Sequence, residues 1–177
     1  MLVTAGCGRS LPEDTEQPAP AGGDTTGAFG DGSAAGQAVE VVGWPGGQRF
    51  VQGAVRGFAA EEPGTRVRVG RSPVVAAVER LCSGQLSVAV ADRPLSPAER
   101  KACAGSVELE VGTVGGSPLY LHTTTDALTK SFESESFLTY AVEQSEQLAS
   151  ESGVTPLTPD EQEETRRTLD DAVAGLG

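Results

Sequence analysis

The 177-residue sequence is poor in residue types on which many common functions depend. Its single histidine, His122, argues against a histidine-rich metal site and against a conventional serine–histidine–aspartate hydrolase. No apolar run approaches the roughly 20 residues of a membrane-spanning helix, which argues against a transmembrane protein. The sequence therefore disfavours the common enzyme classes, and we expect no catalytic residues, no cofactor and no metal site.

The negative charge of the chain is unevenly distributed. The formal net charge is −12, yet residues 39–121 carry eight acidic residues against nine basic ones, eight of which are arginine. Residues 122–177 carry twelve acidic residues against three basic ones. The overall sign argues against nucleic acid as a partner, since phosphates must be neutralised by lysine and arginine. The arginine-rich middle could hold a local anion site, or its arginines could simply be solvated surface residues.

Residues 8–38 differ in composition from the rest of the chain. They are rich in glycine, proline, serine, threonine and acidic residues, and they show no hydrophobic periodicity. Such a segment cannot bury enough apolar area to offset the entropy of ordering it. We therefore predict a disordered linker over residues 8–38 and one folded domain over residues 39–177.

Strand and helix patterns alternate through the predicted domain. Runs of alternating or β-branched residues predict strands at 39–43, 65–69, 86–91, 107–111 and 119–121. Apolar stripes and capping residues predict five helices. The first spans 48–60, the second begins after Ser72 as its N-cap, the third begins after Ser96, the fourth ends at Gly153, and the fifth begins after Thr158. The pattern predicts an α/β fold with a mostly parallel sheet flanked by helices. In such sheets ligands bind beyond the carboxyl ends of the strands, where the loops near residues 43–48, 70–73 and 91–96 fall. His122, placed after the last strand, is expected at the surface.

Short motifs follow one another in a distinctive order. Phe58 precedes Pro63-Gly64 at a helix end, Ser72 follows a strand in a small-residue loop, and 81–85 reads Leu-Cys-Ser-Gly-Gln. Then come 91–96 (Ala-Asp-Arg-Pro-Leu-Ser), 117–121 (Ser-Pro-Leu-Tyr-Leu), the helix from Phe137, and 153–157 (Gly-Val-Thr-Pro-Leu). In this order they resemble the phosphate-binding proteins of the periplasmic-binding-protein (PstS-like) family, and the element at 81–85 resembles that of actinobacterial members.

Two departures from this family stand out. Its members have two lobes that enclose the ligand, whereas here residues 111–116 lead straight from one strand to the next, so a single lobe is expected. The family's first loop carries a serine–threonine pair, which is replaced here by Gly43-Trp44-Pro45-Gly46-Gly47. Trp44 is expected to be a packing residue or an interface anchor rather than a ligand contact.

The resemblance implies a set of residues that bind phosphate. Ser72 would supply its hydroxyl and amide, although it could equally be a plain helix N-cap. Asp92 would accept a hydrogen bond from protonated phosphate, although it could equally cap a turn. Further contacts would come from residues that add positive charge or keep the backbone open: Arg71, Arg93, Gly46 and Gly47.

The resemblance also assigns the three cysteines. It implies a disulfide between Cys82 and Cys103, the alternative being two buried thiols, and this bond would require an oxidising compartment. Cys7 follows Ala5-Gly6, similar to a bacterial lipobox, in which the cysteine is lipidated. Residues 1–7 would then be the remnant of a lipoprotein signal whose true start lies upstream.

The resemblance implies an extracytoplasmic lipoprotein held at the cell membrane by its lipid alone. Its ligand would be inorganic phosphate or a related oxyanion, and it could assist ABC-type phosphate uptake, with a transporter permease or a homodimer as partner. The alternative is a degenerate, ligand-free domain that acts as a protein-interaction module at the cell envelope. The open loop at Trp44 and the acidic C-terminal helices favour that alternative.

Overall fold

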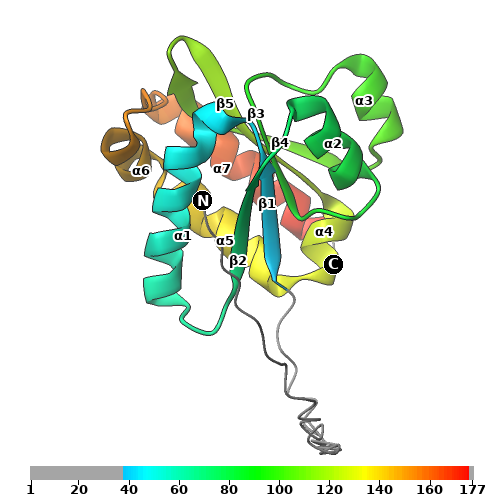
Figure 1. Cartoon of the computed structure of the whole chain (residues 1–177), viewed down its shortest axis with the longest axis horizontal. Coiled ribbons are helices and arrows are strands. Elements are labelled where there is room, and N and C mark those ends of the chain that lie inside the picture. The colour runs from blue at the N-terminus through cyan, green and yellow to red at the C-terminus, as the bar shows by residue number, and fades with distance from the viewer. Residues whose placement is uncertain (1–37, 176–177) are drawn as a thin grey trace, which may run out of the picture. The chain divides into compact units, whose positions relative to one another are not determined.

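The computed structural model describes residues 38–175, which contain a five-stranded sheet (Figure 1). The segments 1–7 and 8–37, with Cys7, lie outside the described residues. The strands are β1 (Val39–Gly43), β2 (Val67–Arg71), β3 (Val88–Ala91), β4 (Ser106–Val114) and β5 (Ser117–Thr124). The helices are η1 (Pro45–Gly47), α1 (Gln48–Glu61), α2 (Val74–Cys82), α3 (Pro97–Ala102), α4 (Thr125–Lys130), α5 (Phe132–Glu143), α6 (Ser145–Ser152) and α7 (Pro159–Ala174).

The strand order across the sheet is β2-β1-β3-β5-β4. β1 pairs in parallel with β2 and β3, whereas β5 lies antiparallel between β3 and β4. Four strands therefore run in one direction, and β5 alone is reversed. The expected α/β fold with a mostly parallel sheet flanked by helices is confirmed.

The last two strands form a hairpin that is longer than predicted. Its turn is Gly115-Gly116, and both glycines have positive φ values, 59° and 88°. Such values suit a two-residue hairpin turn and are costly for other residues. β4 and β5 pair from Ser106↔Thr124 to Val114↔Ser117, with one irregularity between Glu110 and Gly112. The two strands predicted at 107–111 and 119–121 are present, and each is longer than predicted.

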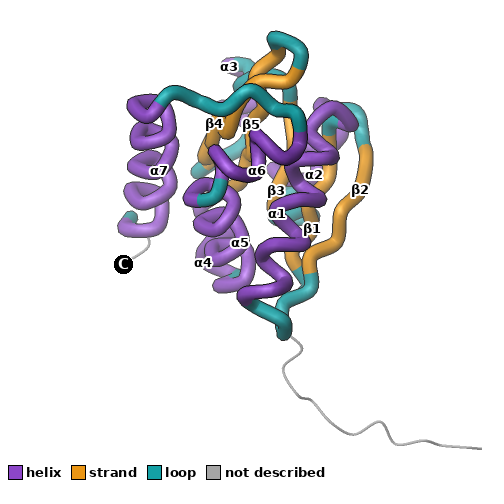
Figure 2. The backbone as a smooth tube through the Cα atoms, turned by 90° about the vertical axis from the view of Figure 1, so that its left-hand side faces the viewer, coloured by secondary structure: helices purple, strands orange, loops and turns teal. Residues whose placement is uncertain are grey.

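Helices cover both faces of the sheet (Figure 2). Alternate residues of β1 point to opposite faces: Val41 packs in the larger core with α1, α5 and α6, and Val42 packs with α2. α7 packs beside the edge strand β4, where its Leu169 joins the larger core. No helix within residues 38–175 is long and apolar enough to cross a membrane.

Helix boundaries match the sequence prediction in part. The predicted capping boxes at Ser96 and Thr158 are present, with both hydrogen bonds formed in each. The single helix predicted before Gly153 is instead two helices, α5 and α6, and α4 precedes them. Ser72 is not an N-cap, because α2 begins after Pro73 and no side chain caps it. Gly153 ends α6 with a left-handed φ of 77°.

A disulfide joins Cys82 at the end of α2 to Cys103, which follows α3. Their Cα atoms lie 4.7 Å apart, and the two cysteines are separated by 21 positions in sequence. The pairing implied by the family resemblance is thus present in the structure. The bond therefore links α3, and the loop at 92–96 that precedes it, to α2.

We expect the double variant Cys82→Ser, Cys103→Ser to unfold with a free energy lower by about 3 kcal/mol, because the bond restricts a loop of about 20 residues in the unfolded chain. Equilibrium urea unfolding at neutral pH measures this difference. Reductant should leave the unfolding midpoint of the double variant unchanged. Equal stability of variant and wild type would contradict the prediction.

Candidate anion-binding site

The carboxyl ends of β1, β2 and β3 meet at one edge of the sheet. Gly43, the last residue of β1, is in register with Arg71 of β2 on one side and with Val90 of β3 on the other. The three loops that follow these strands, 44–47, 72–73 and 92–96, therefore emerge side by side. The topology brings together the loops on which the predicted anion-binding residues lie.

Backbone hydrogen bonds lock these loops to the strand ends. The Trp44 amide donates to the carbonyl of Val90 (2.9 Å), and the Ser72 amide donates to the carbonyl of Gly43 (3.0 Å). The side-chain amide of Gln48 donates to the carbonyl of Gly70 (3.0 Å). The Ser72 amide, expected to face an anion, is therefore already satisfied within the protein.

The two glycines of the first loop serve packing. A Cβ on Gly47 would lie 2.6 Å from Leu119 Cδ1 and 2.7 Å from Val90 Cγ1, so this residue sits directly on the core. A Cβ on Gly46 would collide with the indole ring of Trp44, which itself packs against the core. Gly46 is exposed, and as the second residue of η1 it has no intrahelical acceptor for its N–H.

Three predicted residues remain accessible at this edge. Arg71 is exposed, and Ser72 and Asp92 are half-buried. Among the described residues, the Arg71 guanidinium forms no ion pair. Arg71 ends β2 and Asp92 follows β3, on either side of β1, which puts their backbones about 10 Å apart. Flexible side chains of opposite sign thus flank the end of β1.

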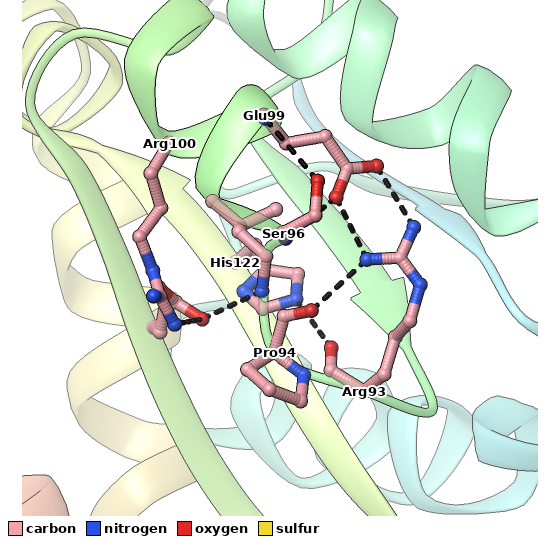
Figure 3. Close-up of polar contacts among 8 residues, drawn as sticks. Arg93, Pro94, Ser96, Glu99, Arg100 and His122 are labelled. Carbon is pink, nitrogen blue, oxygen red and sulfur yellow. Dashed lines mark hydrogen bonds and ion pairs between the residues drawn. The ribbon is translucent and has the colours of Figure 1, made fainter.

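Arg93 is committed to another partner (Figure 3). Its guanidinium makes a two-pronged ion pair with Glu99, with N–O distances of 2.7 and 2.8 Å, and also donates to the carbonyl of Pro94. Glu99 additionally accepts the Ser96 amide at 2.8 Å. The hydrogen bonds from Arg93 lower the pKa of Glu99 to about 2. Arg93 is therefore a structural residue of the 92–96 loop, and its charge is neutralised.

His122 is fully buried, which contradicts its predicted surface position. Its Nε2 lies 3.1 Å from the carbonyl oxygen of Arg93 (Figure 3), and because a carbonyl only accepts, Nε2 carries the proton. Its Nδ1 is buried without a partner among the described residues. The ring stacks on Tyr120 at a centroid distance of 5.4 Å. Burial lowers the pKa of His122, although the Arg93 carbonyl and the Glu108 carboxylate oppose the shift.

Glu108 supplies a third support for the same loop. Its carboxylate accepts the Leu95 amide at 2.8 Å and also the guanidinium of Arg100. Burial raises the pKa of Glu108, but these two hydrogen bonds outweigh it, so the net shift is downward. His122, Glu99 and Glu108 together hold the 92–96 loop in place. Sequence reasoning found Glu99 only as the capping-box residue of the helix after Ser96, and it assigned Glu108 and His122 no role in this loop.

The described residues contain no group of three or more His, Cys, Asp or Glu side chains that could hold a metal ion. A cavity of about 460 Å³ lies near the amino ends of β1, β2 and β3, next to Glu40, Arg66, Arg68 and Lys130. At the candidate anion site, by contrast, Gly46 and Arg71 are exposed.

The sequence matches no protein-family model and no curated protein. Its fold is nevertheless that of a solved structure described as a possible phosphate binding protein from Planctomyces limnophilus DSM 3776. The two share 12% sequence identity with a TM-score of 0.70, and the match covers 79% of this chain and 100% of the other. The expected α/β fold is therefore shared with this solved structure, which matches over its whole length.

Two further solved structures match over smaller parts. One is assigned as the substrate-binding protein of a phosphate ABC transporter from Clostridium perfringens, with bound phosphate (18% identity, TM-score 0.40, 43% of this chain and 30% of that one). The other is an ABC-type phosphate transport receptor from Vibrio cholerae (18% identity, TM-score 0.39, 42% of this chain and 30% of that one).

We expect the Arg93–Glu99 pair to make stability fall steeply in acid. Because the folded-state pKa of Glu99 is about 2, below its ordinary value, its contribution is complete above about pH 4.5 and is lost as the pH falls toward 2. Glu99→Gln should remove this part of the pH dependence in urea unfolding between pH 5 and pH 2.5. Glu163→Gln, at an exposed pair, is the control, and an equal effect of both variants would contradict the assignment.

The only histidine of the chain gives an unambiguous NMR signal. We expect the imidazole of His122 to be the neutral Nε2–H form at pH 7 and to titrate below its ordinary pKa of 6.5. Its stabilising contribution is therefore complete above about pH 6.5 and is lost as the pH falls through the folded-state pKa. Long-range ¹H–¹⁵N spectra report both tautomer and titration, and an Nδ1–H tautomer would refute the arrangement.

Proposed function

We propose that this domain binds inorganic phosphate, or a related oxyanion, at the carboxyl edge of β1, β2 and β3. The observation that carries the proposal is the convergence of three strand ends in a fold shared with a possible phosphate binding protein. The role is one of binding, without catalysis. The wider setting we propose is an extracytoplasmic lipoprotein, lipidated at Cys7, that assists an ABC-type phosphate uptake system.

Four groups at this edge are suited to a protonated oxyanion. The exposed Arg71 guanidinium provides charge and hydrogen-bond donors. The Ser72 hydroxyl and the Gly46 N–H provide neutral donors. Asp92 provides an acceptor, which a protonated phosphate can satisfy and a sulfate, fully ionised at neutral pH, cannot. Arg93 and Gly47 are left out of this set, because the former is paired with Glu99 and the latter packs on the core.

The exposure of the site sets its expected strength. An open edge buries little of a ligand and leaves water to compete for every hydrogen bond. We therefore expect a dissociation constant of about 1 mM, equivalent to roughly 4 kcal/mol of binding free energy. Tighter binding would require a second surface, from a homodimer or a transporter subunit, to cover the ligand.

We expect isothermal titration of the full chain at neutral pH to give saturable heat with phosphate and little with sulfate. Arg71→Ala should weaken phosphate binding about tenfold, since it removes a charge-assisted hydrogen bond. Asp92→Asn should abolish the preference for phosphate over sulfate, because an amide can donate to either anion.

Arg66→Ala is the matched control, because Arg66 lies just before β2, at the end of the strand opposite to Arg71. It should leave phosphate binding unchanged. Absence of heat up to several millimolar phosphate from a folded sample would overturn the proposal, as would equal losses in Arg71→Ala and Arg66→Ala.

A further inference from the structure

A groove of about 310 Å³ lies between α1 and α5, which run side by side (Figures 1 and 2). Its walls combine aromatic residues with carboxylates. The lining residues include Phe58, Phe132, Tyr140, Glu61, Glu62, Glu135 and Glu143. This groove shares no lining residue with the loops of the candidate anion site, and nothing in the proposed phosphate binding uses it.

Phe132 makes the groove unusual, because the side chain is 74% exposed. Only one other large apolar residue within 38–175, Val75, is described as exposed. Phe132 shares the groove with Tyr140 and Phe58, which pack on each other at a ring-centroid distance of 5.8 Å, and Phe58 packs edge-on against the buried Phe137 at 5.6 Å. An exposed phenylalanine at the rim of a rigid aromatic floor is typical of an anchor at an interface.

The groove also carries an uncompensated negative charge. Glu61 and Glu62 end α1, Glu143 ends α5, and neither helix has a basic residue in its last turn. Acidic residues at these ends are disfavoured by the helix dipole, so they are not there to stabilise the helices. Among the described residues, none of the four lining glutamates takes part in an ion pair. Burial and the charges of Glu61 and Glu151 raise the pKa of Tyr140, which reflects the same negative field.

From these contacts we infer that the groove is a docking site for a basic segment of a partner protein, with an apolar side chain against Phe132 and flanking arginine or lysine against the glutamates. Arginine fits both components, because its guanidinium can stack on Phe132 or Tyr140 while it pairs with a carboxylate. A second copy of this chain is a poorer occupant, since its net charge of −12 opposes approach to a carboxylate-lined surface.

The interface differs from the one expected at Trp44. Trp44 packs against the core and shields Gly46, so it offers less accessible apolar surface than Phe132. The docking site does not depend on phosphate binding, and its test can fail or succeed independently of it.

The test is an NMR titration of the ¹⁵N-labelled full chain with the peptide acetyl-Arg-Phe-Arg-amide, with acetyl-Glu-Phe-Glu-amide as the counterpart of opposite charge. We expect saturable shifts at residues 58–62 and 132–143 with the basic peptide only. Phe132→Ser should weaken binding about tenfold, as truncation of an interface anchor does. The pair Glu61→Gln, Glu62→Gln should weaken it about fivefold, as loss of two exposed charge contacts does.

Two matched controls isolate the groove from the overall charge. Val75→Ser removes the other exposed apolar side chain, and the pair Asp170→Asn, Asp171→Asn removes two adjacent charges near the end of α7. Both should bind the basic peptide as the wild type does. Equal losses in both charge variants, or shifts spread over the whole surface, would overturn the proposal. A dimer in sedimentation that Phe132→Ser dissociates would also overturn it, because the occupant would then be a second copy.

Discussion

The reversed insertion of β5 between β3 and β4 is the constraint on which the rest of the domain depends. β5 pairs with both neighbours, its residues from Leu121 to Thr124 are buried, and His122 contacts the loop that follows β3. The same insertion makes β4 the edge strand, and α7 then packs along it. If β4 instead lay beside β3, Ala89 would not pair with His122, and Ala91 would not pair with Tyr120.

The loop after β3 is far more firmly held than an ordinary surface loop. Three side chains from separate segments fix it: Glu99 holds the Arg93 side chain and the Ser96 amide, Glu108 holds the Leu95 amide, and His122 holds the Arg93 carbonyl. The disulfide at Cys103 ties the following segment to α2. The backbone of the 92–96 loop, which begins at Asp92, is therefore fixed by contacts from several elements of the fold.

Some features were readable in the sequence because their causes are local. The capping boxes at Ser96 and Thr158 depend on residues three positions apart, and both were found. The first three strands and α1 follow from short-range periodicity, and the disulfide followed from a family resemblance. Prediction failed where distant packing decides: Ser72 looked like an N-cap, yet its amide bonds to Gly43, twenty-nine positions earlier. The sequence made Arg93 a candidate anion ligand, whereas in the fold its guanidinium pairs with Glu99.

The sequence by itself determined the alternation of strands and helices, the capping boxes that begin α3 and α7, and therefore the α/β class of the fold, because these depend on neighbours within one or two turns of chain. The tertiary structure decided the direction and neighbours of β5, the burial of His122, the pairing of Arg93 and the exposure of Phe132. Each of these depends on which segment occupies the adjacent position in the sheet or helix layer. That choice is settled by the total apolar area buried and the hydrogen bonds satisfied across the whole domain, which no local pattern encodes.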